Sequence, residues 1–494
     1  MCEMMKKLTK INLEQISFWL LCAIVFDCAA LGGGTIVELF GIDIRMVLYG
    51  AFFLCSLPCV LRNFRGILSN RFVLILLAWG LWIIGATVRG ILAGNRMDLI
   101  ISGWVGFASF GILPGAICVL KDRERIGKVM GVVCAAAAFL ALQSLFVLIV
   151  YQLDLDAFVS LNLYMIQQEL GGCTGVDDTV VRIFFRSHPL MVFGCACSLY
   201  RAVKGEKKGE KLLHCANIGL CLFSLLLSYT RSIYLCMIVC IAAVVAGGCF
   251  VLEKEEIKRM WKRIAGAVSA FAAVLLLCDV LLGAGFLNYG VYRSVGVDVL
   301  NRVEVSLGLE DGALGGGYDV TEATKPKETK PKETKPRPQS TKPTTDASDP
   351  DFDINAWSDD LRGRTVAELM ERIKQKPLTG SGMGAALDAR ADGYNEYFYL
   401  DQIYKTGLIG ILLYMAPMAL MALAVLEGRK KEDAFLRVVW LAGLGGIAAF
   451  SALNPYLNGS NGIVLYCCTI AVFSAYNQKN SAISKKSNRK EDIL

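Results

Sequence analysis

The chain has 494 residues, of which 55% are hydrophobic and 19% are charged, and its mean hydropathy is +0.49. A water-soluble domain of this length rarely combines so much apolar sequence with so few charges, so the composition excludes an ordinary soluble globule and predicts a membrane protein. The formal net charge of +7 is explained by basic loops between membrane spans and needs no nucleic-acid partner.

Apolar runs long enough to cross a bilayer recur along almost the whole chain. A crossing takes about 20 mostly apolar residues in a helix, because lipid offers backbone amides no hydrogen-bonding partners. The sequence therefore predicts an all-α integral membrane protein with about twelve transmembrane helices. The spans are expected to begin near Ile16, Ile42, Phe72, Leu99, Val129, Ile183, Leu213, Ile233, Ile264, Thr406, Phe435 and Gly462.

Basic residues mark every second connection between these spans. Lys and Arg are retained on the cytoplasmic side, so the alternation predicts a multi-pass protein of the cytoplasmic (inner) membrane with both termini in the cytoplasm. The first span lacks a small-residue cleavage site and is expected to remain as an anchor. The basic clusters are Lys6 to Lys10, Arg62 to Arg71, Lys121 to Arg125, Arg201 to Lys211, Lys254 to Arg263, Arg429 to Lys431 and Lys485 to Lys490.

The cysteine pattern predicts neither a disulfide framework nor a metal site. Nearly all of the 18 cysteines fall inside apolar runs, where they behave as small hydrophobic residues. Only Cys173 lies in a segment predicted to be external, and no set of Cys and His residues has the spacing of zinc ligands. We expect no metal and no cofactor.

One connection, between the ninth and tenth predicted spans, is much longer than the others. The sequence predicts nine spans in residues 1–286, a large external loop over 287–405, three further spans in 406–476 and a cytoplasmic tail over 477–494. The pattern places the large loop on the outer face of the membrane.

The large loop has two contrasting parts. Residues 321–350 are rich in Lys, Pro and Thr, a composition that predicts an extended spacer without a packed core. Residues Leu361 to Lys374 carry apolar side chains at helical spacing, which predicts an amphipathic helix that lies on the membrane or caps the helical bundle.

Arginines gather at the predicted outer ends of the spans. Arg231, in the sequence SYTRSIYL, lies between two spans so close together that the turn is expected at the outer surface. A planar guanidinium binds phosphate oxygens in pairs, so converging arginines would hold a pyrophosphate. The alternative for each is an interfacial anchor that pairs with lipid phosphate or a loop carboxylate. The other predicted external candidates are Arg182, Arg186, His188, Arg293 and Arg302.

A glycine-rich turn closes the large loop. The sequence PLTGSGMGAA is followed by YNEYFYLDQIYKTGLIGILLY, which leads into a span. Gly380, Gly382 and Gly384 permit close backbone approach, and exposed amides there would contact an anionic or sugar ligand. No predicted strand precedes the turn, so a dinucleotide-binding fold is not supported.

These stretches resemble the O-antigen ligase/O-antigen polymerase family of membrane glycosyltransferases. An Arg-led helix, a P-L-x-G-x-G turn, a short aromatic motif and a helix opening with G-L-I-G resemble the C-terminal signature of that family. SYTRSIYL is similar to the family's serine/threonine-arginine turn. The layout of about twelve spans with one large late external loop is similar as well.

The resemblance implies a GT-C-like, metal-independent glycosyltransferase that passes a glycan from an undecaprenyl-pyrophosphate donor to an acceptor hydroxyl. Arg231 and Arg364 match the family arginines that hold the pyrophosphate. The ligases usually have histidine where this chain has Glu396, which favours a polymerase and makes Glu396 the candidate general base. The alternative for Glu396 is a surface carboxylate pairing with Lys405 or Arg390.

The expected function is polymerisation of undecaprenyl-pyrophosphate-linked repeat units during assembly of O-antigen or of a surface, capsular or exopolysaccharide. The implied partners are the lipid-linked donor, the acceptor glycan and membrane lipid, with a flippase and a chain-length regulator as candidate protein partners. Two alternatives stay open: a ligase with another acceptor, and a flippase or transporter for the same lipid-linked glycan. A transporter predicts charges near mid-membrane in paired halves. Asp27 and Asp279 are the main intramembrane acids, and no internal repeat is evident.

Overall fold

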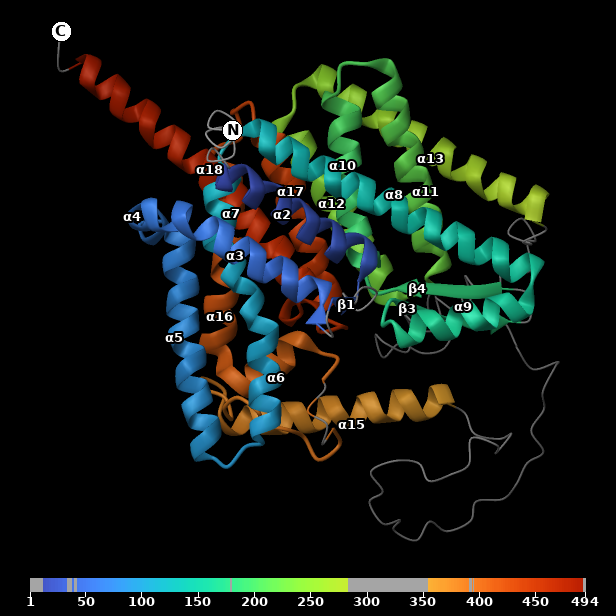
Figure 1. Ribbon diagram of the computed structural model, residues 1–494, viewed down its shortest axis with the longest axis horizontal. Helices are drawn as coiled ribbons and strands as arrows, with labels where there is room; N and C mark the ends of the chain where they lie inside the picture. Colours follow the sequence, from blue (N-terminus) through green and yellow to red (C-terminus); the bar gives the residue numbers. More distant parts are fainter. Residues whose placement is uncertain are drawn as a thin grey trace, which may run out of the picture.

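A computed structural model describes residues 12–32, 38–39, 42–177, 180–282, 354–390, 393 and 395–491. In these ranges the chain is an all-α integral membrane protein, and its only sheets are two antiparallel hairpins (Figure 1). Ten helical segments are long and apolar enough to cross a membrane. The expectation of an all-α membrane fold is confirmed.

The candidate spans are built from one or more helices each. They are α2 (Leu13–Phe26) with the π-helical η1 (Asp27–Leu31), α3 (Ile44–Arg62), α5 (Arg71–Leu92), α6 (Met97–Ala108) with the 3-10 helix η2 (Ser109–Ile112) and α7 (Leu113–Val119), α8 (Arg123–Leu153), α11 (Lys208–Leu227), α12 (Arg231–Val251), α13 (Lys254–Leu282), α16 (Phe398–Glu427) and α17 (Ala434–Ser451).

The two remaining predicted spans fall on shorter apolar stretches. One is α10 (His188–Lys204), which has 17 residues, and the other is Ser460–Tyr476, the apolar first part of α18 (Ser460–Glu491). A helix of about 17 residues is at the short end of what crosses a bilayer. The expected start near Ile183 is wrong, because Val180–Phe185 forms strand β4 and the helix begins at His188.

The shorter elements lie in the connections between the spans. They are the strands β1 (Glu38–Leu39), β2 (Ile42–Asp43) and β3 (Gly171–Asp177), and the helices α4 (Phe64–Leu68), α9 (Leu155–Gln167), η3 (Tyr456–Asn458) and α15 (Ile354–Gln375). β1 pairs with β2, and β3 pairs with β4.

Helix α10 forms the centre of the main bundle. Every residue from His188 to Ser198 is buried, and α10 packs against α8, α11, α12 and α17. The close approach of α17 depends on Gly443, because a Cβ there would lie 2.1 Å from the Phe193 ring. The Phe193 and Trp440 ring centroids lie 5.0 Å apart beside it.

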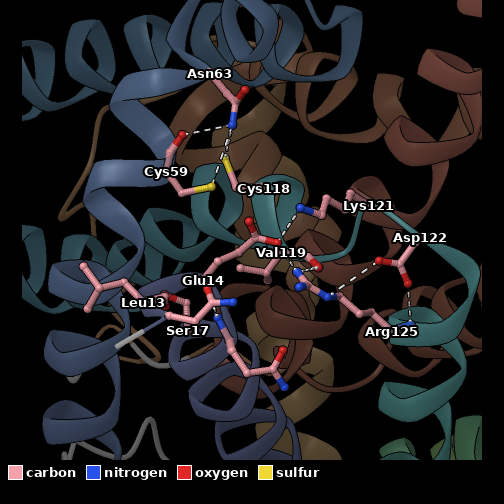
Figure 2. Close-up of polar contacts among 12 residues, drawn as sticks. Leu13, Glu14, Ser17, Cys59, Asn63, Cys118, Val119, Lys121, Asp122 and Arg125 are labelled. Atoms are coloured by element: carbon pink, nitrogen blue, oxygen red, sulfur yellow. Dashed lines mark hydrogen bonds and ion pairs between the residues drawn. The ribbon is translucent and has the colours of Figure 1, made fainter. Parts of the chain in front are cut away.

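At one end of the bundle, a polar cluster joins α2, α7 and α8 (Figure 2). Glu14 Oε1 lies 2.5 Å from Lys121 Nζ and 2.5 Å from Arg125 NH1, while Asp122 Oδ1 accepts from the Arg125 amide at 2.8 Å. Lys121 of the α7–α8 connection and Arg125 of α8 thus hold Glu14 at the start of α2. This is the end where the sequence predicts the cytoplasm.

The predicted amphipathic helix of Leu361 to Lys374 is confirmed as part of α15. Of its two expected positions, packing on the bundle is the one found, because Leu369 is fully buried against Ala385, Leu387 and Tyr404. Figure 1 shows α15 across the lower ends of α5 and α6, opposite α4.

Helix α16 is divided by a kink at Gly407. Gly407 has φ +75°, and a Cβ there would lie 2.1 Å from the Leu378 carbonyl oxygen. The predicted boundary between the external loop and the tenth span, at 405/406, falls at this kink. The eight residues Phe398–Lys405 are therefore already helical before the kink.

Candidate functional site

A cavity of about 660 Å³ lies between the α15–α16 region and the main bundle. Its wall comes from α6, β4, the first turns of α16 and the connection between α17 and α18. This volume lies within the range of small-molecule sites, about 300–1,000 Å³. The cavity is therefore large enough for a sugar or a lipid headgroup.

Three cationic side chains and one carboxylate line the cavity: Arg45, Arg186, Lys405 and Asp401. Arg45 is the most enclosed cation, with 9% of its surface exposed. Its Nε lies 2.6 Å from Asp27 Oδ2, its NH1 donates to Ser460 Oγ at 2.9 Å and its NH2 donates to the Gly32 carbonyl at 2.9 Å. The guanidinium is thus fixed in one orientation at the cavity wall.

A second buried ion pair stands at the start of α16. Lys405 Nζ lies 2.8 Å from Asp401 Oδ1, one helical turn away, and Asn395 Nδ2 donates to the same Asp401 oxygen at 2.5 Å. The side chains of Lys405 and Asp401 are 15% and 5% exposed. Lys405 Nζ also donates to Asp401 Oδ2 at 2.9 Å, so burial and three polar contacts fix this carboxylate at the cavity wall.

Arg186 differs from the other two cations because its ion pair is exposed. Its NH1 lies 2.7 Å from Glu169 Oε2, and about half of each side chain is accessible, 51% for Arg186 and 53% for Glu169. An exposed pair of this kind stabilises a protein by about 0–1 kcal/mol. A ligand anion can therefore replace Glu169 at little cost.

Part of the remaining wall is apolar and aromatic. It includes Leu99, Phe107, Phe184, Phe450 and Tyr456. Burial raises the pKa of the Tyr456 phenol, so this side chain stays protonated and neutral. The cavity therefore combines fixed cationic side chains with apolar and aromatic ones, an arrangement that suits a ligand with an anionic group and an apolar part.

Three amides of the glycine-rich turn bind protein carbonyls, although Met383 and Gly384 of the turn also line the cavity. Its glycines at 380, 382 and 384 have φ of +72°, +93° and +74°. The amides of Ser381, Gly382 and Met383 donate to the carbonyls of Tyr404, Lys405 and Ala86 at 2.7, 3.0 and 3.0 Å. The expectation that exposed amides of this turn bind a ligand is wrong for these three amides, since each already has a protein acceptor.

Among the described arginine, histidine and glutamate candidates from the sequence, only Arg186 lines the cavity, and Gly384 of the glycine-rich turn lines it as well. Arg364 lies on the exposed face of α15. Arg231 begins α12 and does not line the cavity. Its neighbour Ser232 contacts the cavity wall, because Ser232 Oγ accepts from Nδ2 of the lining residue Asn454 at 2.8 Å. Arg293, like Arg302, lies outside the described residues.

Glu396 adjoins the cavity residue Asn395 but is itself held by two arginines. Arg362 Nε donates to its Oε2 at 2.9 Å, and Arg390 NH2 donates to its Oε1 at 3.4 Å. The alternative expectation of a pair with Arg390 is confirmed. Lys405, the other expected partner, pairs with Asp401.

His188 lies inside the protein and not on its surface. It is fully buried, with Nδ1 accepting from the Phe185 amide at 3.2 Å and Nε2 lying 3.1 Å from Ser224 Oγ. Arg182 holds the turn before Arg231, because its Nε donates to the Ser228 carbonyl at 3.0 Å. His188 and Arg182 therefore form hydrogen bonds within the protein, and neither residue lines the cavity.

Sequence reasoning missed Arg45 and the polar residues of the α17–α18 connection. Arg45 is an isolated charge at the start of an apolar run, and such a charge marks a candidate site in a membrane helix. The connection reads NPYLNGSN, a polar stretch between two apolar helices. Both signals were present in the sequence.

No protein-family model matches the chain, and no curated protein is detectably similar to it. The fold and the cavity define the class as a multi-pass, all-α membrane protein with a cavity lined by charged, polar and aromatic side chains. Among the described residues, no group of three or more His, Cys, Asp and Glu side chains is placed to hold a metal ion.

Proposed function

We propose that the protein is a glycosyltransferase that polymerises undecaprenyl-pyrophosphate-linked glycans on the outer face of the cytoplasmic membrane. The observation that carries this proposal is the cavity, in which Arg45, Arg186 and Lys405 share a wall with apolar and aromatic side chains. An amphiphile with a pyrophosphate head matches both parts of that wall. The resemblance to the O-antigen ligase/polymerase family supports the same substrate class.

The proposed reaction is a single displacement at the donor sugar. The acceptor hydroxyl oxygen forms a bond with the anomeric carbon, while the bond from that carbon to the pyrophosphate oxygen breaks. The bonding electron pair leaves with the lipid pyrophosphate, whose charge the cavity cations stabilise. The hydroxyl proton passes to a carboxylate. Asp401 is the carboxylate on the cavity wall, and Glu396 is the one that the resemblance implies.

Replacing Arg186 with alanine is expected to lower kcat/KM for a lipid-linked oligosaccharide by about 10- to 100-fold, the effect of losing one hydrogen bond to a charged group. The measurement is mass spectrometry of lengthened glycans made by the purified chain in nanodiscs. Arg96→Ala is the matched control, because Arg96 also forms an exposed ion pair, at 2.5 Å from Asp98, and does not line the cavity.

Equal activities of the Arg186→Ala and Arg96→Ala variants would contradict the proposed site. A chain that moves the lipid-linked glycan across the bilayer but forms no new glycosidic bond would be a flippase, and the proposed function would be wrong. Transfer only to an acceptor other than a second lipid-linked repeat would favour the ligase.

Substitution of the two carboxylates tests which one receives the proton. Asp401→Asn is expected to lower kcat by about 100-fold or more, as for the loss of a general base. Glu396→Gln is expected to lower kcat much less. The reverse order would favour Glu396, and an unchanged kcat in both variants would exclude a single carboxylate base at either position.

A further inference from the structure

Carboxamide side chains make up a distinct part of the cavity wall. Five carboxamide residues line the cavity and form what we call the carboxamide wall: Asn395, Gln402, Asn454, Asn458 and Asn461. The two charged pairs beside them are internally balanced, with Arg45 bound to Asp27 at 2.6 Å and Lys405 bound to Asp401 at 2.8 Å.

Three members of the carboxamide wall already donate to the protein. Asn395 Nδ2 donates to Asp401, Asn454 Nδ2 to Ser232 Oγ and Asn461 Nδ2 to the Gly32 carbonyl, at 2.5, 2.8 and 3.0 Å. The Oδ1 atoms of Asn395 and Asn461 are buried without a partner. An unpartnered buried acceptor is costly, so a ligand donor within reach of these oxygens would stabilise the site.

Gln402 and Asn458 keep their amide groups free. In the part of the chain that the structure describes, neither side-chain amide takes part in a hydrogen bond, although both residues line the cavity. Gln402 is only 5% exposed as a residue, and it lines the cavity. Its amide is therefore available to a ligand in the cavity.

Carboxamides present a donor and an acceptor side by side. A phosphate group offers acceptors alone and would leave the amide oxygens without partners, whereas a sugar hydroxyl both donates and accepts. Phe450 and Tyr456, with ring centroids 5.4 Å apart, add apolar surface to the same wall for the carbon face of a sugar ring. A carboxylate-bearing sugar beside the carboxamides would be repelled by the buried Asp401 carboxylate on the same wall.

We infer that the carboxamide wall is a subsite for a neutral, hydroxyl-bearing sugar residue. The inference rests on the proposed function and assigns the sugar-binding part of the same cavity, with Gln402 and Asn458 as its direct contacts. Arg186 remains the contact for the anionic group.

The test uses the full chain in nanodiscs of neutral lipid and saturation-transfer NMR with lipid-free oligosaccharides. The panel contains neutral hexose and N-acetylhexosamine chains and matched chains that carry a uronate. Neutral chains are expected to bind, and Gln402→Leu and Asn458→Ala are each expected to raise their Kd about 10-fold, the effect of one to two lost hydrogen bonds. Gln143→Leu is the matched control, because the Gln143 Oε1 in α8 is also buried without a partner but lies outside the cavity wall.

Absence of glycan binding, equal binding by all three variants, or a preference for the uronate chains would each overturn the subsite. Binding of inorganic pyrophosphate, measured separately with the Arg186→Ala variant, distinguishes this failure from failure of the proposed function. If pyrophosphate binds in a way that depends on Arg186 but no glycan binds, the anion site of the proposed function is supported and only the sugar subsite is wrong.

Discussion

Replacing Asp27 with alanine is expected to lower the free energy of unfolding by about 3–5 kcal/mol, because the substitution leaves the buried Arg45 guanidinium without a counter-ion. The two side chains are only 5% and 11% exposed, and the Nε–Oδ2 distance is 2.6 Å. The remaining partners of Arg45, Ser460 Oγ and the Gly32 carbonyl, are neutral and cannot balance its charge. Unfolding in detergent, followed by circular dichroism with increasing denaturant, measures the change.

Two further variants separate stability from function. Asp27→Leu combined with Arg45→Met replaces the pair with apolar side chains, a change that is often neutral or stabilising, so folding should recover while transfer activity stays low. Asp98→Ala breaks the exposed Arg96–Asp98 pair, whose side chains are 54% and 62% exposed, and should leave the free energy of unfolding nearly unchanged. Equal losses in Asp27→Ala and Asp98→Ala would contradict a structural role for the buried pair.

Most of the helical spans could be predicted because the length of an apolar run is a local property of the sequence. The segments of α5 and α12 follow directly from uninterrupted apolar stretches. The start of α10 was misplaced for a local reason too. Val181 and Ile183 are as apolar as a span, but β-branched residues favour strands, and the backbone of this segment pairs with β3 before His188 opens the helix.

The site was predicted less well because its contacts join residues far apart in the chain. Arg45 meets Ser460 across 415 positions, and Arg89 donates to the Thr379 carbonyl across 290 positions. A basic residue at the end of an apolar helix is a candidate site residue, but the sequence does not show whether that residue pairs with a ligand or with another part of the protein. Glu396 illustrates the second case, since Arg362 and Arg390 hold it.

The glycine-rich turn shows the same limit. Its spacing correctly indicates tight backbone approach, and the φ values of Gly380, Gly382 and Gly384 bear this out. Which groups approach depends on where α5 and α16 pack, because their carbonyls take the amides of the turn. Helix packing is not encoded in a local motif, so the ligand-binding interpretation of these amides could not be excluded from the sequence.

Alanine at Gly90 is expected to destabilise the protein by about 1–3 kcal/mol and to reduce transfer, because it overpacks the contact between α5 and the turn. A Cβ at Gly90 would lie 2.2 Å from the Met383 carbonyl oxygen and 3.0 Å from the Met383 amide nitrogen. Backbone atoms cannot rotate away as a flexible side chain can, so the turn must move. Met383 and Gly384 both line the cavity, so that movement changes the cavity wall itself.

Gly80 in the same helix provides the matched control. No atom lies within 4 Å of a Cβ at Gly80, so Gly80→Ala should only add helix propensity and raise stability by up to about 1 kcal/mol. Both proteins are compared by thermal unfolding and by glycan transfer in nanodiscs. If Gly90→Ala is as stable and active as Gly80→Ala, α5 does not hold the turn in place. A loss confined to Gly90→Ala would instead show that the glycine-rich turn acts through its fit against α5, since its amides at Ser381, Gly382 and Met383 are already occupied.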